Sequence, residues 1–173
     1  KNIIPKNNKI LNSPMNPIIL GGGQEFGFRS GTEDVPKIIG FKKAIEITER
    51  IKNQNLKRIK ELSSYFLKKI KGIFPNIEIN GKNIDSNERI PNIVNIYIPE
   101  KDRESLLIAM DLKGICASSG SACASRANKE SHILKAMGFN NERISQSIRF
   151  SFGRYTTKQE INQAIKILKD VLK

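Results

Sequence analysis

Apolar residues recur at helical spacing through the first half of the chain. From about Val35 onward they follow intervals of three and four residues, the period of an amphipathic helix. They are Ile38, Ile39, Phe41, Ala44, Ile45, Ile59, Leu62, Phe66, Ile70 and Ile73. This pattern predicts one long helix or two helices in series. Residues 1–19 have no such period and are rich in Pro and Asn, which is typical of a connecting arm.

Short β-branched runs follow the helical pattern. Residues 77–79 and 93–98 are bounded by Asn, Gly, Pro and Asp, so we expect them to form two paired strands. Residues 147–152 alternate apolar and polar side chains as a strand does, and the apolar run 115–117 also predicts a strand. Strands and helices therefore alternate along the chain, which favours an α/β fold.

Three further helices are predicted in the second half. One covers residues 102–113 and ends at a glycine, and a second, around Ile133 and Met137, also ends at a glycine. Thr157 and Glu160 form a capping box ahead of the third helix. Its apolar face consists of Ile161, Ile165, Leu168 and Leu172. The small and polar residues between the first two of these helices predict a loop.

The composition is that of a globular domain. The chain has 173 residues, of which 38% are hydrophobic and 27% charged. Because it starts at Lys1 and its first methionine is Met15, we expect it to be part of a longer protein. No apolar run approaches the roughly 18 residues of a membrane span, and no secretory signal precedes the two cysteines. These features predict a cytoplasmic protein with free thiols and no membrane contact.

The formal net charge of +13 raises the possibility of a nucleic-acid partner, because Lys and Arg neutralise phosphates. The 30 basic residues are mostly lysines, however, and they are spread over helical faces and loops. Aromatic residues make up only 6% of the chain and form no basic stacking pattern. A general compositional bias explains the charge, and we expect no nucleic-acid partner.

The segment from Gly21 to Asp34 is the first candidate for chemistry. Arg29, Thr32 and flexible glycine backbone precede a predicted helix, an arrangement that can bind a phosphate group. The segment matches neither the P-loop nor the dinucleotide fingerprint, and the carboxylates of Glu33 and Asp34 would repel a phosphate. The alternative, favoured on local chemistry, is that the glycines only make turns and that Thr32 caps the helix.

Cys123 lies in the second candidate segment, among small residues of the predicted loop. Such a position gives a thiol the access that a nucleophile needs, and the nearby Arg126 would favour the thiolate. A buried small hydrophobe explains Cys116 better, because Cys116 lies in an apolar run. A Cys123–His132 hydrolase dyad is a further possibility, although a packing or capping role explains His132 within its helical pattern. Two cysteines and one histidine do not match a zinc-site spacing.

Arg149 marks the third candidate segment, residues 147–154. It lies within a predicted strand whose alternate residues are apolar. A guanidinium at such a position can bind a small carboxylate through two parallel hydrogen bonds. The alternative is an ordinary structural ion pair. When Arg149 is considered without the other segments, this alternative is favoured.

Taken together and in this order, the segments GGGQE…RSGT, SSGSACAS and SIRFSFGRYTT resemble the cysteine desulfurases of the NifS/IscS type. These are class-V aminotransferases that bind pyridoxal 5'-phosphate (PLP) in fold type I. The resemblance implies the C-terminal small domain of such an enzyme, an α/β unit with a small, mostly antiparallel sheet packed against helices. It assigns residues 1–33 to an arm of the PLP-binding large domain, and residues 34–173 to the small domain with its long linking helix. The full enzymes are homodimers of roughly twice this length.

The resemblance also assigns roles to residues. Thr32 would donate to the PLP phosphate of the neighbouring subunit, and Arg149 would bind the carboxylate of L-cysteine. Cys123 would accept the sulfur as a persulfide while L-alanine leaves. The sulfur would pass to an iron–sulfur scaffold protein, where Cys123 would transiently ligate the nascent cluster.

The chain departs from this family pattern in two ways. The PLP lysine belongs to a Ser-His-Lys context that the chain lacks, so it would lie outside this chain and the chain alone would be inactive. Asp34 stands where relatives usually have Asn. The alternative function is a non-catalytic module that relays sulfur or binds the scaffold without PLP chemistry.

Overall fold

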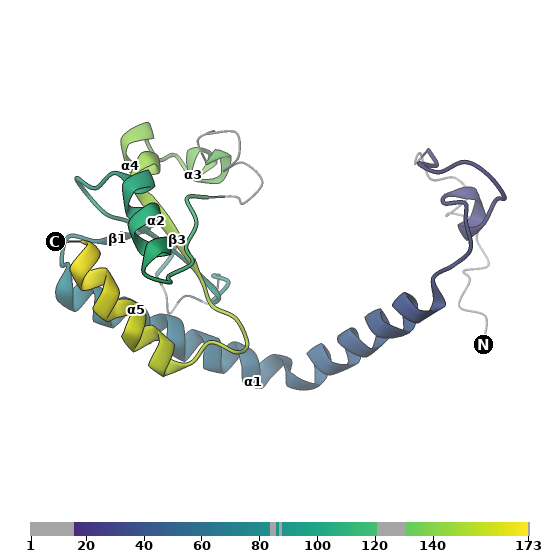
Figure 1. The fold of residues 1–173 in the computed structure, drawn as a ribbon, viewed down its shortest axis with the longest axis horizontal. Helices are drawn as coiled ribbons and strands as arrows, with labels where there is room; N and C mark the ends of the chain where they lie inside the picture. The colour runs from purple at the N-terminus through teal and green to yellow at the C-terminus, as the bar shows by residue number, and fades with distance from the viewer. Residues whose placement is uncertain (1–15, 84–85, 87, 121–130, 173) are drawn as a thin grey trace. The chain divides into compact units, whose positions relative to one another are not determined.

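The computed structural model describes residues 16–83, 86, 88–120 and 131–172 (Figure 1). The predicted nucleophile Cys123 lies outside the described residues. No helix in these described ranges combines the length and the hydropathy that a membrane span requires.

The chain divides into two units, Lys1–Arg50 and Ile51–Lys173. The domain boundary expected between residues 33 and 34 stays a prediction. In the first unit, the 3-10 helix η1 (Glu25–Gly27) precedes the long helix α1 (Val35–Ile73), which continues into the second unit. One continuous helix therefore replaces the alternative of two helices in series.

Asp34, and not Thr32, caps the N-terminus of α1. The Asp34 carboxylate accepts a hydrogen bond of 3.1 Å from the Lys37 amide and forms an ion pair of 2.6 Å with Lys37 Nζ. These contacts with the side chain and amide of Lys37 lower the pKa of the Asp34 carboxyl. The capping role considered for Thr32 is therefore wrong, because an acidic side chain nearer to the helix accepts from the Lys37 amide of its first turn.

The second unit contains a three-stranded antiparallel sheet. Its strands are β1 (Glu78–Ile79), β2 (Ile93–Tyr97) and β3 (Ser147–Ser151), in the spatial order β1-β2-β3. The predicted pairing of the first two strands is confirmed, with Ile79 opposite Ile96. A small, mostly antiparallel sheet is what the sequence resemblance implied.

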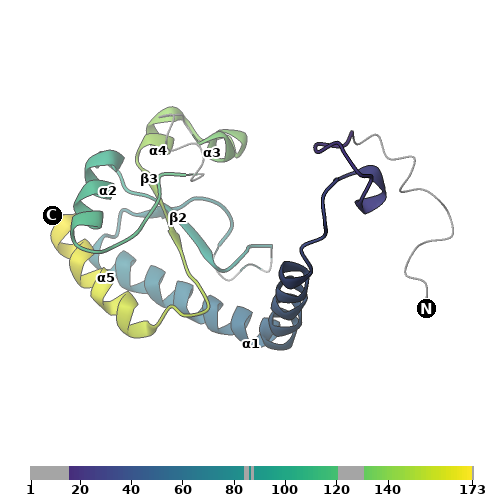
Figure 2. The ribbon, with the colours of Figure 1, turned by 45° about the vertical axis from the view of Figure 1, so that its right-hand side comes forward.

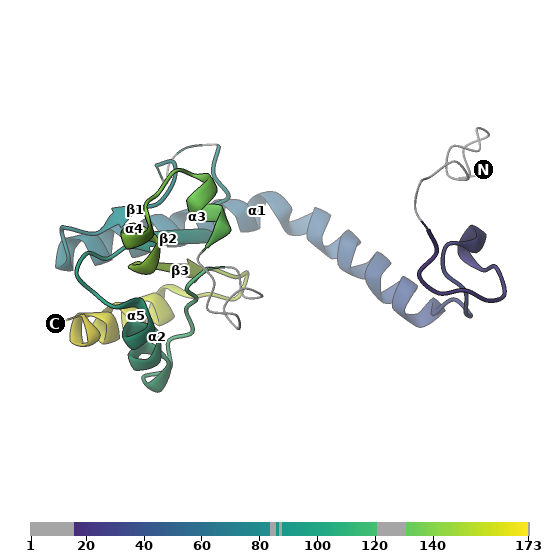
Figure 3. The same ribbon diagram turned by 90° about the horizontal axis from the view of Figure 1, so that it is seen from above.

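Four helices join or follow these strands. They are α2 (Arg103–Leu112), α3 (His132–Ala136), α4 (Asn141–Ser145) and α5 (Lys158–Val171). The capping box predicted at the start of α5 is present. In Figure 2, α5 runs alongside the part of α1 that belongs to this unit, and Figure 3 shows α2 next to α5. The helix α4 was not predicted; it is a short helix of five residues capped by Asn140.

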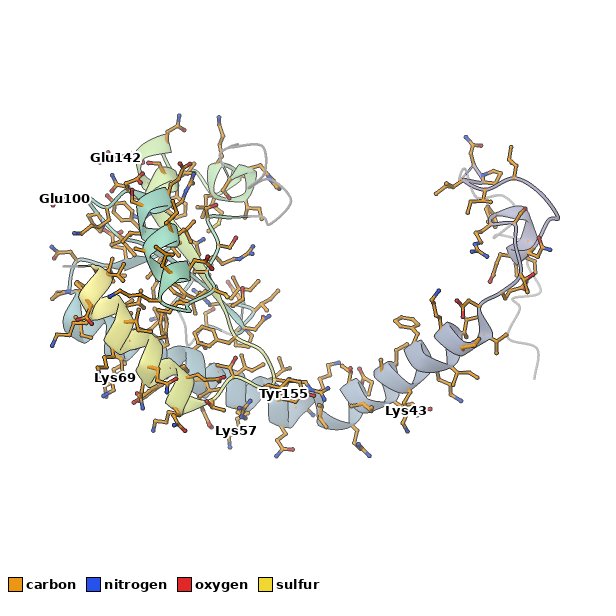
Figure 4. All side chains as sticks on the ribbon, viewed as in Figure 1. Lys43, Lys57, Lys69, Glu100, Glu142 and Tyr155 are labelled. Atoms are coloured by element: carbon orange, nitrogen blue, oxygen red, sulfur yellow. The ribbon has the colours of Figure 1, made fainter. Side chains whose placement is uncertain are left out.

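The hydrophobic core lies between one face of the sheet and the helices α1, α2 and α5. Val94 and Ile96 of β2 pair with Phe150 and Ile148 of β3 and turn the same face inward. The ring of Phe66 from α1 contacts the rings of Phe150 and Phe152 at centroid distances of 4.9 and 5.5 Å. Lysines such as Lys57 and Lys69 of α1 lie outside this core and are exposed (Figure 4).

The strand predicted over residues 115–117 is wrong. The amide of Ile115 donates to Met110 O at 2.9 Å and the amide of Gly114 to Asp111 O at 2.9 Å, which closes α2 in a Schellman motif. An amide used in a helix cap cannot also join a sheet ladder, and the chain reaches β3 only at Ser118. Cys116 is exposed, so its expected burial is also wrong.

The capping box gives a first test of this unit. Thr157→Ala removes the hydroxyl that accepts from the Glu160 amide, and we expect it to lower the free energy of unfolding by about 1 kcal/mol. Urea denaturation measures the change. Thr48→Ala is the matched control, because its hydroxyl lies within α1 and bonds only the Ala44 carbonyl. An equal effect of the two substitutions would contradict the capping role.

The same box predicts a pH dependence. Hydrogen bonds from the Thr157 amide and hydroxyl lower the pKa of the Glu160 carboxyl in the folded chain. A lowered folded pKa means that this stabilisation is complete above the unfolded pKa and is lost as the pH falls through the folded pKa. We expect the stability difference between the wild type and Glu160→Gln to shrink below about pH 4. A difference that stays constant with pH in urea titrations would contradict this expectation.

Candidate functional site

The face of the sheet opposite the core carries polar side chains. Residues of a strand alternate between its two faces. Val94 and Ile148 point to the core, so Asn95 of β2 and Arg149 of β3 lie on the opposite face. Asn95 and Arg149 are direct partners across the ladder. A cavity of about 400 Å³ lies over this face. Its other walls include Asn80, Arg89, Gly120, Ser131, Ile133 and Met137.

Arg149 lines this cavity, and the described residues form no ion pair with its side chain. Its Nε atom is buried and has no hydrogen-bond acceptor among the described residues. The ion pairs formed by the described part of the chain do not include Arg149. The structural ion pair considered from the sequence is therefore not found there. A half-buried guanidinium without an anion favours an anionic ligand, since an unpaired charge is costly to bury.

The backbone of Arg149 connects this cavity to the segment that leads to Cys123. The Arg149 amide donates to Ser118 O at 2.7 Å, and the Ser118 amide donates to Arg149 O at 3.1 Å. This isolated bridge fixes the start of the predicted loop beside the arginine. The position of Cys123 relative to Arg149 stays a prediction.

A polar network beside Arg149 was not predicted. Asn80 is 5% exposed, and its Nδ2 donates to Asn95 Oδ1 at 2.7 Å and to Ser147 Oγ at 2.8 Å. Its Oδ1 accepts from Arg143 Nε at 2.7 Å. The one sequence feature that could have indicated this network is Asn95 itself, a polar residue between two apolar strand neighbours. The contacts with Asn80 and Arg143 depend on tertiary structure that the sequence pattern does not contain.

Arg89 is a second arginine of the cavity that the sequence analysis missed. Its two terminal nitrogens each donate to a backbone carbonyl at 2.8 Å, one of Lys82 and one of Ile93. Burial lowers the pKa of its guanidinium. With both terminal nitrogens bonded to backbone, Arg89 ties the connection between β1 and β2 to the start of β2 and shapes the cavity wall.

Thr32 belongs to the first unit, where its side chain is exposed. Arg29 Nη1 donates to the carbonyls of Gly31 and Thr32 at 3.3 Å, and the Gly31 amide donates to Gln24 Oε1 at 3.0 Å. These donors therefore have intramolecular acceptors, and Asp34 occupies the helix N-terminus. The Thr32 hydroxyl has no partner among the described residues. A phosphate could accept a hydrogen bond from this hydroxyl. The N-terminus of α1 is already capped by the Asp34 carboxylate.

Among the described residues, the other candidate side chains do not assemble into a site. His132 is exposed at the first position of α3, so the packing role considered for it is wrong. Within the described ranges, no three His, Cys, Asp or Glu side chains gather as metal ligands would. The Cys123–His132 dyad stays untested because Cys123 is not described.

Comparisons with known proteins agree with the sequence resemblance. The class-V aminotransferase profile matches residues 10–164. Cysteine desulfurase IscS 1 of Archaeoglobus fulgidus is 37% identical over 158 residues, which cover 91% of this chain and 40% of the relative. The mitosomal cysteine desulfurase of Encephalitozoon cuniculi is 44% identical over 149 residues, which cover 86% of this chain and 33% of the relative.

Solved structures show the same likeness. The NifS-like protein of Rickettsia africae superimposes with a TM-score of 0.77 at 36% identity, over 92% of this chain and 41% of that one. Another NifS-like protein gives a TM-score of 0.75 at 28% identity. The predicted fold, a small-domain portion of a fold-type-I enzyme, is confirmed. The chain spans about two fifths of the length of these relatives. With the profile match over most of its residues, the chain belongs to the class-V aminotransferase family.

Proposed function

We propose that this chain is the C-terminal part of a PLP-dependent cysteine desulfurase, which converts L-cysteine to L-alanine and carries the sulfur as a persulfide on Cys123. The observation that supports it most is Arg149, which lines a cavity of about 400 Å³ with no anionic partner among the described residues. The relatives at 34 to 44% identity are named cysteine desulfurases. Their names and the arginine point to the same substrate, an amino acid with a free carboxylate.

Arg149 binds the carboxylate of L-cysteine in this proposal. Its planar guanidinium suits a two-point contact with a carboxylate. Pairing with β2 on one side and the bridge to Ser118 on the other fix its backbone. A substrate oriented through its carboxylate presents its sulfur in a constant direction. The cavity is open to such a small ligand, and its floor is the polar face of the sheet.

Cys123 receives the sulfur. Its thiolate attacks the substrate sulfur, a new S–S bond forms, and the electron pair of the broken C–S bond remains on the carbon skeleton that leaves as alanine. PLP, bound to a lysine outside this chain, supplies the electron sink that this bond cleavage requires. Arg126, three residues further, favours the thiolate by its charge.

Thr32 donates one hydrogen bond to the PLP phosphate of the neighbouring subunit in a homodimer. Its exposed hydroxyl, without a partner among the described residues, fits such a contact. The carboxylate of Asp34 is neutralised locally by Lys37 at 2.6 Å, which weakens its repulsion of a phosphate. The remaining phosphate contacts come from the large domain, to which residues 1–33 belong as an arm. Residues 34–173 form the small domain.

The sulfur passes from Cys123 to an iron–sulfur scaffold protein in the cytoplasm, and Cys123 transiently ligates the nascent cluster there. The residues that lead into the sulfur-bearing segment begin at Ser118, which is bonded to Arg149, and they include Gly120, which lines the substrate cavity. The persulfide therefore forms beside the substrate site and must move away from it to meet an acceptor.

The nucleophile is tested in an enzyme reconstituted from this chain and a polypeptide that supplies the PLP-binding portion. Cys123→Ser is expected to abolish alanine release from L-cysteine while the PLP absorbance remains. Cys116→Ser is the matched control, because Cys116 is an exposed thiol of the same unit with no assigned role. Alanine release by the Cys123 variant would refute the assignment. Scaffold binding without any alanine from the wild type would favour the non-catalytic alternative.

The substrate site is tested by Arg149→Lys in the same reconstituted enzyme. A lysine keeps the charge but loses the two-point geometry, and we expect kcat/KM for L-cysteine to fall roughly 10- to 100-fold. Arg50→Lys, an exposed position of α1, is expected to leave kcat/KM unchanged. Equal values for the two variants would remove Arg149 from the substrate site.

A further inference from the structure

We propose that Asn95 is a second binding residue for the substrate carboxylate, and that Arg143 orients it through Asn80. This inference rests on the proposed function, because it assigns a further contact to the same amino-acid ligand. It concerns residues that the sequence analysis did not single out. Two features of Asn95 support this role, its closeness to Arg149 and the atom of its amide that faces the cavity.

Asn95 and Arg149 form a closely spaced cross-strand pair. The amide and carbonyl of Arg149 both bond Ser118, on the side of β3 away from β2. The carbonyl of Asn95 accepts from the Asn80 amide at 2.9 Å, on the side of β2 away from β3. Neither residue therefore exchanges backbone hydrogen bonds with the other, which defines the non-hydrogen-bonded pair of an antiparallel ladder. In such pairs the side chains approach more closely, with Cβ atoms about 4.5 to 5.5 Å apart.

The chemistry of Arg143 fixes which way the neighbouring amides point. A guanidinium only donates, so the Asn80 atom at 2.7 Å from Arg143 Nε is the oxygen. The other end of the Asn80 amide is then the nitrogen, which donates to both Asn95 and Ser147. The Asn95 atom that meets this donor at 2.7 Å is consequently Oδ1.

Arg143 is itself firmly placed. Its Nη1 atom lies 2.5 Å from a carboxylate oxygen of Glu78. Its guanidinium carbon lies 5.0 Å from the ring centre of Tyr97 and 4.5 Å from that of Phe139. An ion pair and two aromatic contacts restrict the guanidinium more than any of them would alone. The donor that begins this chain of hydrogen bonds is therefore constrained by three neighbours.

The remaining polar atom of Asn95 is its Nδ2, which carries two N–H donors. No described residue accepts a hydrogen bond from it, and Asn95 lines the same cavity as Arg149. A guanidinium and a primary amide side by side present donors and no acceptor, which suits a carboxylate and disfavours a cation. An aspartate at this position would keep the acceptor for Asn80 but would pair with Arg149 and exclude an anionic ligand.

The test measures binding of a simple carboxylate, propionate, to the 173-residue chain by NMR titration, without cofactor. The signals of the Asn95 side-chain amide, assigned by their loss in Asn95→Asp, are expected to shift on titration. Asn95→Asp is expected to weaken propionate binding at least about tenfold. Asn95→Ser replaces the two amide donors by a shorter side chain with one hydroxyl, without adding charge, and should also weaken propionate binding. Asn76→Asp, which adds the same charge at an exposed residue outside this cavity, is the matched control and should bind as the wild type does.

The outcomes separate this inference from the proposed function. Suppose that Arg149→Lys weakens propionate binding while both Asn95 variants bind propionate as the wild type does. That result would overturn the role of Asn95 and leave the carboxylate site in place. Titrations of the wild type without any shift of cavity residues would overturn both. An effect of Arg143→Lys on the Asn95 amide signals and on propionate affinity, at unchanged thermal stability, would support the orienting role. If the Asn95 amide signals and the propionate affinity stay unchanged in that variant, Arg143 does not orient Asn95.

Discussion

The side-chain alternation of the β2–β3 ladder is the constraint on which the rest of the second unit depends. One face of these strands supplies Val94, Ile96, Ile148 and Phe150 to the core, which the helices α1, α2 and α5 cover. The other face is then obliged to carry Asn95 and Arg149 toward the cavity. A slip of one residue in the register would exchange the two faces, burying a guanidinium and exposing the core. Folding of the core and placement of Arg149 are thus one event.

The desolvation of Arg149 links this register to binding. A guanidinium in a partly enclosed cavity, with a buried Nε and no partner among the described residues, loses hydration that only an anion can replace fully. The nearby network does not use it: Arg143 pairs with Glu78, and Asn80 joins Arg143 to Asn95 and Ser147. Arg143 and Arg149 of the same unit thus have different roles. Arg143 is satisfied within the fold, whereas Arg149 remains available to a ligand.

Sequence reasoning predicted the features that depend on local pattern. The long helix, the three strands of the sheet and the capping box of α5 follow from periodicity and from side chains three residues apart. It failed at residues 115–117, because an apolar run does not reveal that the Ile115 amide closes α2. It found Arg149 as a strand guanidinium but not the Asn80–Arg143 contact, which joins residues 63 positions apart. Such pairings follow from the fold and leave no local trace in the sequence.

The ladder also limits how far from Arg149 the proposed nucleophile Cys123 can lie. Ser118 exchanges two backbone hydrogen bonds with Arg149, so its position relative to this arginine is fixed. Cys123 follows five residues later, and a chain segment spans at most about 3.6 Å per residue, which places its Cα within roughly 18 Å of the Ser118 Cα. Gly120, which lies between Ser118 and Cys123 in the sequence, lines the cavity. In the proposed enzyme, a thiol on such a tether would have to meet both a substrate bound by Arg149 and an acceptor outside the cavity.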